Sequence, residues 1–516
     1  MALLRTRQEL EAWRRQQRGP LHFVPTMGAL HRGHEALIAQ AAQPRAEGLP
    51  VVLVSVFVNP LQFGAGEDFS RYPRHLARDG AVAAAAGAAA VFAPEPAELF
   101  PGGEAELTRI QPPQSLLQSL CAPGRPGHFA GVATVVVRLL ALVRPQLLLL
   151  GEKDWQQLVI LRRVVRDLGL PVTVQGCATV RQPDGLAFSS RHAYLSAQEQ
   201  RRATALPTLL TAIARDGLRG GSEPTPAAAA ELRRRLEQSG LDVEYTALVE
   251  AHSLKPVHRV AGLTLLAAAV RCGSARLIDH TFLMSRAPIV AIDGPAGAGK
   301  STVTRAFASR LGLIYLDTGA MYRAVTWLVR QQGADPADAA AVAPLLLDLD
   351  LQLLGGAEQR VLLGGQDITA VIRSPEVTAQ VSVVAAHACV REALTGQQQA
   401  MGKSGGLVAE GRDIGTAVYP DADLKVFLTA TVAERARRRA QDLTQRGFVV
   451  PPQAELEAQI ADRDHQDSSR SIAPLCRAGD AVELITDGMT IEAVIEALVD
   501  LFRQRIPHDA WPDPAP

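Results

Sequence analysis

The sequence predicts an α/β fold class, with two parallel β-sheets that follow one another along the chain. In the first half, apolar segments typical of strands, at 21–28 and 51–58, enclose a helix-like segment, GHEALIAQAAQ. Another apolar strand segment, at 289–292, begins a second alternation after more than half of the 516 residues have passed. Strand–helix–strand alternation favours parallel sheets, whose ligands bind at the carboxyl ends of the strands.

The first half is predicted to contain a large α/β part and a smaller lobe. Val132–Val143 has a helical pattern and Gln146–Leu150 a strand pattern, which together continue the alternation. After about Cys177 the sequence changes to Ala- and Arg-rich helical segments at 199–240 and a strand pattern at 263–270. These later elements are too few for a second large sheet, so they predict a small α+β lobe.

The domain boundaries follow from these patterns. We expect a first domain over 1–286, divided into a Rossmann-like part, 1–175, and the smaller lobe, 176–286. A second domain is expected over 287–516. The joint MSRAP at 284–288 is short, and the C-terminal HDAWPDPAP is expected to be frayed.

The composition indicates small-molecule partners. Lys+Arg and Asp+Glu both number 53, so the chain has no global basic field for nucleic acid. The five cysteines are far apart and form no CxxC pair, which is typical of reduced cytoplasmic thiols. The Ala-rich stretch AVAAAAGAAAVFAP is too short to span a bilayer. We therefore predict a cytoplasmic protein that binds neither nucleic acid nor membrane.

A phosphate-binding loop follows the strand at 289–292. GPAGAGKS, at 294–301, fits GxxxxGK[ST] between a predicted strand and a predicted helix, which makes a chance glycine loop the weaker alternative. Lys300 would reach the β/γ-phosphates of ATP, as the catalytic residue of this half, and Ser301 would bind Mg²⁺ through ATP. The predicted ATP contacts are Gly294, Pro295, Ala296, Gly297, Ala298, Gly299, Lys300, Ser301 and Thr302.

Further motifs narrow the class of P-loop protein. A GTPase would need an NKxD guanine motif, but the only asparagine is Asn59, in the other half. LDTGAMYRA at 316–324, GRDIGT at 411–416 and DRDHQDSSR at 462–470 together resemble the cytidylate kinase family of P-loop nucleoside monophosphate kinases, over about 287–505. Transfer of phosphate to a dianionic monophosphate needs several Arg donors, and these motifs contain them.

The resemblance implies the contacts of a CMP acceptor. Arg323, Arg412 and Arg470 would hold its phosphate, Ser382, Arg391 and Asp413 would bind cytosine, and Arg463 and Asp467 would hold the sugar. Thr318 is expected in the same site. The run at 435–439 would be a lid, although a solvated helix face explains any single Arg of that run equally well. Asp317 would either lie near the acceptor or cap a helix.

A pair of histidines marks the first half. PTMGALHRGHEAL, at 25–37, places His31 and His34 three residues apart at a strand-to-helix turn. Both can donate to phosphate oxygens near the positive helix end. The alternatives are two surface histidines or a zinc site, but no HExxH motif and no third ligand cluster occurs.

Four more stretches narrow the set of protein families to which this histidine turn could belong. FVNPLQFGAGEDFSRYPR, RPGHFAGVATVV, GEKDWQQL and FSSRHAYLS, with the histidine turn, resemble the pantothenate synthetase (pantoate–β-alanine ligase) family over about 1–283. That family has a nucleotidylyltransferase-type fold. Pantoate attacks the α-phosphorus of ATP to give pantoyl adenylate and pyrophosphate, and β-alanine then displaces AMP. The two halves together resemble a fusion, the bifunctional pantoate ligase/cytidylate kinases.

The resemblance also implies residue roles. His34 would be the catalytic general acid, Gln62 and Gln157 would bind pantoate or β-alanine, and Asp154 would bind the Mg²⁺ of ATP; a helix-surface glutamine is the alternative for Gln157. The predicted ATP contacts are Met27, Gly28, Ala29, Leu30, His31, Arg32, Gly33, His34, Gly151, Glu152, Lys153, Asp154, Val180, Phe188, Ser189, Ser190 and Arg191. One departure is His192, where the family usually has Asn.

Two alternative functions stay open from the sequence. One half could be a non-catalytic nucleotide-binding regulatory module, or the first half could be a different adenylyl or cytidylyl transferase, since histidine turns are shared widely. The family resemblance implies that ATP is used as a substrate together with Mg²⁺ and that no organic cofactor is needed. Ligases of this family tend to dimerise, so a homodimer through the first half is expected.

Overall fold

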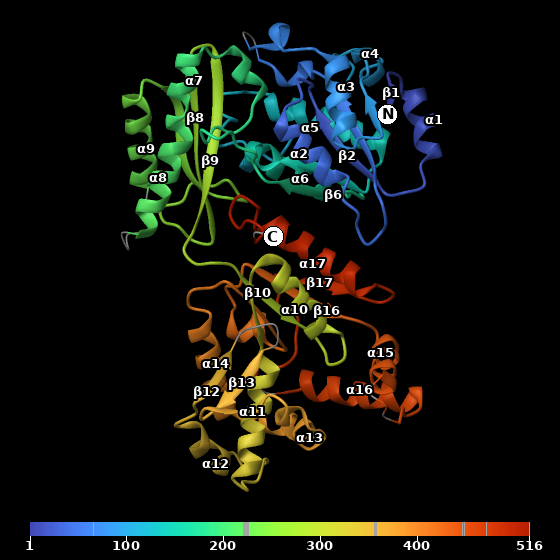
Figure 1. The fold of residues 1–516 in the computed structure, drawn as a ribbon, viewed down its shortest axis with the longest axis vertical. Helices are drawn as coiled ribbons and strands as arrows, with labels where there is room; N and C mark the ends of the chain where they lie inside the picture. Colours follow the sequence, from blue (N-terminus) through green and yellow to red (C-terminus); the bar gives the residue numbers. More distant parts are fainter. Residues whose placement is uncertain are drawn as a thin grey trace. The chain divides into compact units, whose positions relative to one another are not determined.

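The computed structural model of the chain describes residues 1–64, 67–219, 226–354, 359–445, 447, 449–470 and 472–514. These residues form two compact units (Figure 1). The first unit is Met1–Ser285 with Ile506–Pro512, and the second is Arg286–Arg505 with Asp513–Pro516. The predicted second domain, 287–516, therefore differs from the structure at its C-terminal end.

The C-terminal segment also differs from the frayed tail that the sequence predicts. Residues 506–512 pack within the first unit, where the backbone N–H groups of His508 and Asp509 donate hydrogen bonds. The prediction treated HDAWPDPAP as a polar tail without partners. The structure supplies partners for it, as described below.

The first unit is built on a six-stranded parallel sheet in the order β1-β4-β3-β2-β5-β6. Its inner strands β2, β3, β4 and β5 are mostly apolar and buried, as expected of a parallel sheet that is covered on both faces. The bounds of the strands are β1 Ala2–Leu4, β2 Leu21–Thr26, β3 Val51–Val56, β4 Ala90–Phe92, β5 Leu147–Gly151 and β6 Thr173–Cys177.

Helices cover both faces of this sheet. Along β2, Phe23 belongs to the cluster that contains α5 and α6, whereas Val24 belongs to the cluster that contains α2 and α3. This alternation follows from the period of two residues along a strand. The bounds of the helices are α1 Arg7–Gln16, α2 Arg32–Ala41, α3 Leu76–Ala85, α4 Pro96–Leu99, α5 His128–Val143 and α6 Trp155–Asp167.

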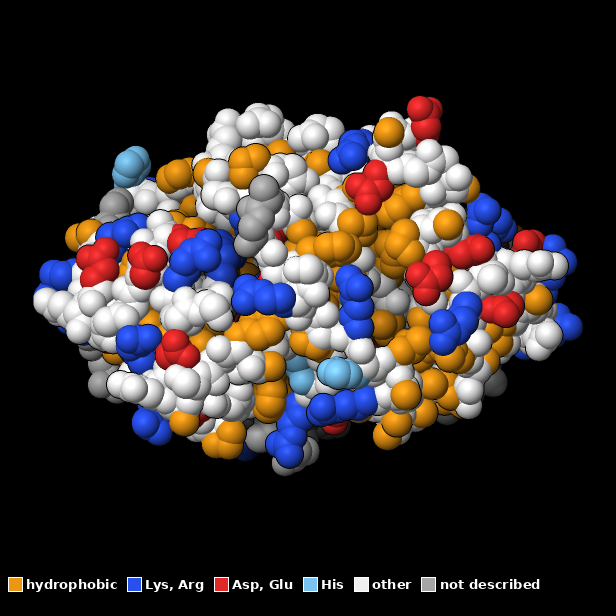
Figure 2. Space-filling model, turned by 90° about the horizontal axis from the view of Figure 1, so that it is seen from above, with side chains coloured by type: hydrophobic (Ala, Val, Ile, Leu, Met, Phe, Trp, Pro, Cys, Tyr) orange, Lys and Arg blue, Asp and Glu red, His pale blue; other side chains and the backbone are white. Residues whose placement is uncertain are grey.

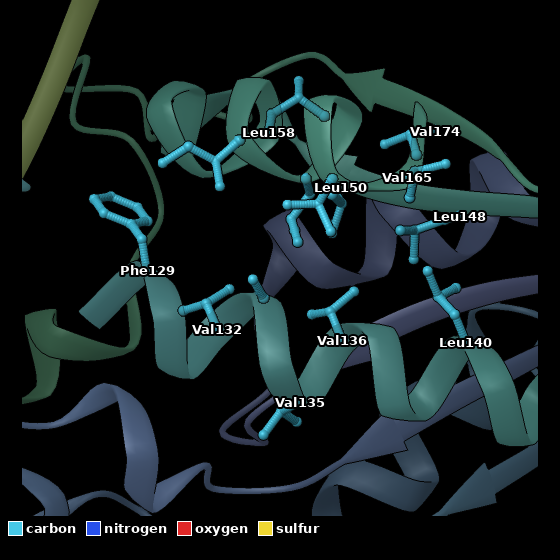
Figure 3. Packing of buried hydrophobic residues seen from close by; sticks show 14 of the residues in the cluster. Phe129, Val132, Val135, Val136, Leu140, Leu148, Leu150, Leu158, Val165 and Val174 are labelled. Atoms are coloured by element: carbon cyan, nitrogen blue, oxygen red, sulfur yellow. The ribbon is translucent and has the colours of Figure 1, made fainter. Parts of the chain in front are cut away.

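The apolar packing fixes α5 against the sheet. In Figure 3, Val136 and Leu140 point from α5 toward Leu148 and Leu150 of β5. Gly131 lets α5 approach the backbone of Leu61 closely, because a Cβ at this position would lie 2.1 Å from the carbonyl oxygen of Leu61. The helix thus positions the short 3₁₀ segment η1, Pro60–Gln62.

The smaller lobe contains a three-stranded antiparallel sheet, β7-β8-β9, with α7, α8 and α9 beside it (Figure 1). Along β8, Leu265 and Ala267 join the core of the larger part, whereas Leu266 and Ala268 join the core of the lobe. The bounds are α7 Ala197–Ala203, α8 Ala205–Arg219, α9 Pro226–Gln238, β7 Asp242–Glu250, β8 Leu263–Cys272 and β9 Ala275–Met284.

The second unit is built on a five-stranded parallel sheet in the order β11-β15-β10-β16-β17 and carries a small antiparallel sheet, β12-β13-β14. The strands are β10 Ile289–Asp293, β11 Ile314–Asp317, β12 Leu351–Leu354, β13 Arg360–Leu363, β14 Gln366–Asp367, β15 Leu407–Gly411, β16 Leu424–Thr429 and β17 Val482–Ile485. The helices are α10 Lys300–Leu311, α11 Thr318–Gln331, α12 Ala339–Val342, α13 Pro375–Val384, α14 Ala388–Met401, α15 Val432–Gln445, α16 Gln453–Ser468 and α17 Ile491–Arg505.

The surface matches the neutral composition. Lys and Arg side chains are interspersed with Asp and Glu on the face that Figure 2 shows. Within the part of the chain that the structure describes, no helix has the length and apolar character needed to cross a membrane.

The close approach at Gly131 yields a stability prediction. Gly131→Ala should destabilise the first unit by about 1–3 kcal/mol, since the new Cβ forces α5 away from Leu61. Urea unfolding followed by hydrogen exchange of peptides from each unit measures this effect. Gly396→Ala, in the open interior of α14, is the control and should be neutral or stabilising. A neutral Gly131→Ala would contradict the argument.

Candidate active sites

The first candidate site lies at the carboxyl ends of β2 and β5. These neighbours are the point where the strand order reverses, which is where open α/β sheets bind ligands. Most of the predicted residues line one pocket there. They are Met27, His31, Gly33, His34, Gln62, Gly151, Lys153, Asp154, Gln157, Val180, Phe188, Ser189, Ser190 and Arg191.

The two histidines open α2 in a defined orientation. His31 is the N-cap, and its Nδ1 accepts a hydrogen bond from the N–H of Gly33 at 3.2 Å. Nδ1 of His34 accepts from the N–H of His31 at 3.3 Å, and the ring centroids are 4.1 Å apart. Because a backbone N–H can only donate, Nδ1 is the unprotonated nitrogen of each ring, and Nε2–H is left as a donor.

The pKa values of the two histidines agree with neutral rings. Burial, together with Lys153 and His192, lowers the pKa of His31 to about 4. Burial and the neighbouring His31 lower the pKa of His34 to about 3. Both rings are therefore neutral at pH 7 in the free protein. Among the described residues, no group of three or more His, Cys, Asp and Glu side chains is arranged to hold a metal ion.

The turn before α2 is held by a residue that the sequence did not point to. Asp79 of α3 accepts hydrogen bonds from the N–H of Leu30 at 2.8 Å and of Ala29 at 3.1 Å. Gly28, at φ +86°, is needed because a Cβ there would lie 2.9 Å from Asp79. Gly28, Ala29, Leu30 and the exposed Arg32 do not line the pocket, so the geometry does not support their predicted contact with ATP.

Gln62 is held in place by its neighbours. Asn59 caps η1, and its amide donates to Oε1 of Gln62 at 3.1 Å and to the carbonyl of Gly131 at 3.2 Å. The amide of Gln62 lies 2.9 Å from Sδ of Met27. The rarity of Asn in this sequence was the signal for Asn59, which lines the pocket with Gln62.

A half-buried ion pair lies beside this pocket, with Arg125 in the pocket lining, and it was missed as a site element. Arg125 donates to both carboxylate oxygens of Glu67, at 2.7 and 2.6 Å, and its Nη1 lies 2.9 Å from Nε2 of His128. Burial and Arg125 lower the pKa of His128 to about 4, so this ring is also neutral. Both Arg125 and His128 belong to the RPGHFAG stretch, which was the available signal.

The FSSRH stretch also lies at the pocket. Arg191 pairs with Asp68 at 3.2 Å, and Oγ of Ser190 lies 3.2 Å from the phenol of Tyr72. His192 contacts the amide of Gln182 at 2.7 Å through Nδ1 and lines an adjoining pocket rather than this one.

Glu152 is the one member of the GEKD stretch that the pocket excludes. Its side chain is fully buried, whereas the next two residues, Lys153 and Asp154, line the pocket. The carboxylate accepts hydrogen bonds from residues of the C-terminal segment. The geometry therefore does not support a direct contact between Glu152 and ATP.

The second candidate site begins at the end of β10. Gly294 must be glycine, since a Cβ there would lie 2.0 Å from the carbonyl oxygen of Leu428. Gly299, at φ +83°, is the N-cap of α10. Nζ of Lys300 donates to the carbonyls of Gly294 and Pro295 at 2.8 and 2.9 Å. Burial, with Arg412 nearby, lowers the pKa of Lys300 to about 7.

Carboxylates from two neighbouring strands face this loop. Ser301 donates to Oε1 of Glu410, at the end of β15, at 2.5 Å. Asp317, at the end of β11, caps α11 through the N–H of Ala320 and pairs with Arg323 at 2.9 Å. Asp317 is thus a helix cap, as one sequence alternative expected, and it also lines the pocket; its place near the acceptor stays a prediction.

The arginines of this pocket share their carboxylate partners. Asp467 accepts from Arg412 at 3.0 Å and also from Arg470. Arg391 and Asp413 form a buried ion pair. A site in which several guanidinium groups converge can hold an anion with more than one charge.

The pocket of the second unit contains nearly all of its predicted residues. They are Ala296, Gly297, Ala298, Gly299, Lys300, Ser301, Thr302, Thr318, Arg323, Ser382, Arg391, Arg412, Asp413, Arg463, Asp467 and Arg470. Gly294 and Pro295 lie outside the lining. Tyr322 and Glu410 line it without having been predicted.

The basic run at 435–439 serves two roles. Arg435 donates to the carbonyl of Ala296 at 3.1 Å, and Arg438 donates to that of Ala298 at 3.3 Å, so both brace the phosphate loop. Arg437 pairs with Glu434 and its side chain is 54% exposed, as a solvated helix face predicts.

Both units are similar to known protein families. The family model for pantoate–β-alanine ligase matches residues 2–282, and that for cytidylate kinase matches residues 290–504. Bifunctional pantoate ligase/cytidylate kinases from Parasynechococcus marenigrum (strain WH8102) and Prochlorococcus marinus (strain MIT 9313) are similar to this chain. The first is 62% identical, over 99% of this chain and 100% of its own length. The second is 61% identical, over 98% of this chain and 99% of its own length.

A solved structure resembles the first unit. The crystal structure of pantothenate synthetase from Thermus thermophilus matches with a TM-score of 0.50 and 43% identity, over 54% of this chain and 98% of that one. The first unit thus has a nucleotidylyltransferase-type fold, and the second is a P-loop nucleoside monophosphate kinase domain. With two matched halves and full-length relatives, the chain belongs to the bifunctional pantoate ligase/cytidylate kinase family.

Proposed function

We propose that this chain is an enzyme with two independent active sites. The first unit condenses pantoate with β-alanine at the expense of ATP, giving pantothenate, AMP and pyrophosphate through pantoyl adenylate. The second unit transfers the γ-phosphoryl group of ATP to CMP or dCMP, giving CDP or dCDP and ADP. The observation that supports this proposal is that each unit has its own pocket, where the turn predicted to bind phosphate lies with the residues predicted to bind the acceptor.

In the first site, hydrogen-bond donors would stabilise the leaving pyrophosphate. The Nε2–H groups of His31 and His34 and the ammonium of Lys153 are available at the pocket. Fixed donors aimed at developing charge need no reorganisation during the reaction. Since His34 is neutral in the free protein, we assign it first to this role as a donor; it becomes the predicted general acid only if bound triphosphate raises its pKa.

Pantoate would lie between neutral side chains. Gln62, held by Asn59, and Gln157 both line the pocket. An amide can orient the carboxylate of pantoate without a full positive charge, so the attacking oxygen keeps its nucleophilicity. Ser189, Ser190 and Arg191 would bind the phosphates from the opposite loop, with Phe188 and Val180 toward the adenine.

In the second site, catalysis would consist of positioning and charge neutralisation. Lys300 and the loop N–H groups would hold the β- and γ-phosphates, while Arg323, Arg412 and Arg470 would hold the acceptor phosphate. The buried Arg391–Asp413 pair presents one donor and one acceptor beside Ser382, which suits the edge of cytosine. Arg463 and Asp467 would bind the sugar.

Both sites would use ATP as its Mg²⁺ complex. Ser301, with Glu410 beside it, offers oxygen ligands in the second unit, and Asp154 offers a carboxylate in the first. The homodimer through the first unit and the cytoplasmic location stay predictions. The alternative of a regulatory half has no support in the comparisons, since models of two enzyme families match residues 2–282 and 290–504.

Variants of the two turns should separate the activities. Lys300→Ala should lower CMP phosphorylation by about 10²-fold or more and leave pantothenate formation within about twofold. His34→Ala should do the reverse. ADP release with CMP and AMP release with pantoate and β-alanine measure the two reactions on the same sample. Loss of both activities in either folded variant would contradict independence.

The neutral histidines should also make the first unit sensitive to acid. Between about pH 4 and 6.5, His31 and His34 are unprotonated in the folded state but protonated when unfolded. The unfolded state then binds more protons, so stability falls as pH falls, by about 1 kcal/mol per pH unit for each ring.

Urea unfolding between pH 5 and 6.5 measures that slope. In the double variant His31→Gln/His34→Gln, the stability of the first unit should depend less on pH than in the parent chain. The second unit, which contains neither residue, is the internal control. An unchanged slope in the double variant would show that other groups, such as His128, cause the acid sensitivity.

A further inference from the structure

The buried carboxylate of Glu152 has partners that lie more than 350 residues later in the chain. Its Oε1 accepts a hydrogen bond from the N–H of His508 at 2.9 Å, with Nδ1 of the same residue at 3.2 Å. Its Oε2 accepts from the N–H of Asp509 at 2.9 Å. Gly176 of β6 makes room for this side chain, because a Cβ there would lie 3.0 Å from it.

Asp509 extends the connection to a second loop of the same site. Its carboxylate accepts from the N–H of Thr179 at 2.9 Å and from the hydroxyl of Thr179 at 2.5 Å. Thr179 lies between β6 and Val180, and both residues line the first pocket. One short segment therefore joins the loop that follows β5 to the loop that follows β6.

Apolar contacts seat this segment in the first unit. Ile506 is 2% exposed, and Ala510 packs against the main hydrophobic cluster of that unit. These residues follow α17 in the sequence, yet they cluster with Met1–Ser285. The family model for the ligase ends at residue 282 and does not include them.

We propose that His508 and Asp509 are positioning residues of the ligase ATP site. They hold Glu152 and Thr179, and through them they fix the backbone that presents Lys153 and Val180 to the nucleotide. Without the segment, a buried carboxylate and a threonine would lose their hydrogen-bond partners, and both loops would have to rearrange. The ligase site thus requires the segment 506–512, which contains His508 and Asp509.

The consequence is specific to ATP binding. Pantoate and β-alanine would contact Gln62 and Gln157, which lie on η1 and α6. Among the described residues, the hydrogen bonds of the segment go to Glu152 and Thr179 instead. Loss of the segment should therefore raise the KM for ATP of the ligase reaction by about tenfold, with kcat changed by less than about threefold. The kinase constants should stay unchanged. This inference rests on the proposed ligase function, whose failure would show as no pantothenate formation by the parent chain.

The test compares two shortened chains. One ends at Arg505 and lacks the segment, and the other ends at Pro512 and keeps it; both lack Asp513 and the residues after it. We expect the higher KM for ATP only in the chain that ends at Arg505. Kinase activity of the same samples shows that the second unit is folded, and a ligase kcat close to that of the parent shows that the first unit is folded.

Point variants make the test independent of truncation. In the full chain, Asp509→Ala should raise the KM for ATP, and Asp509→Asn should restore part of it, because an amide oxygen still accepts from Thr179. Thr179→Val combined with Asp509→Ala should add little to Asp509→Ala alone. A KM for ATP within twofold of the parent in both Asp509→Ala and the Arg505-ended chain would overturn the proposal, as would a fall in kcat alone.

Discussion

The need to hold phosphate groups at the start of a helix governs both units. In each unit a central strand of the parallel sheet, β2 or β10, is followed by a short loop and then by a helix, α2 or α10. The unpaired N–H groups and the dipole at that helix end attract anions. The rest of each fold supplies what this turn requires, which is apolar packing behind it and polar side chains from neighbouring strand ends around it.

The two units meet the requirement with different chemistry. The second would use glycines at 294 and 299, the buried Lys300 and a group of arginines. The first would add neutral donors to Lys153 and Arg191, namely two histidines that are fixed by backbone N–H groups. The difference suits the reactions, because a carboxylate nucleophile must stay reactive in the first site whereas two phosphate dianions must be brought together in the second.

Much of this could be predicted from sequence, because local motifs place their own residues. The strand–loop–helix around Lys300 and the histidine pair needed only short-range patterns, whereas the roles predicted for the arginines of the second pocket came from the family resemblance. Asp79, Glu410 and the Glu67–Arg125 pair were missed as site elements because their partners lie far away in the sequence. The C-terminal segment was mispredicted for the same reason, since its polar residues gain partners only in the folded first unit.

If each turn holds its own phosphate groups, one chain contains two separate ATP sites. Calorimetric titration with a non-hydrolysable Mg·ATP analogue tests it directly, with pantoate and CMP each added in turn. The account predicts two nucleotides per chain, one tightened by pantoate alone and the other by CMP alone. A single nucleotide per chain, or one site that responds to both acceptors, would contradict it.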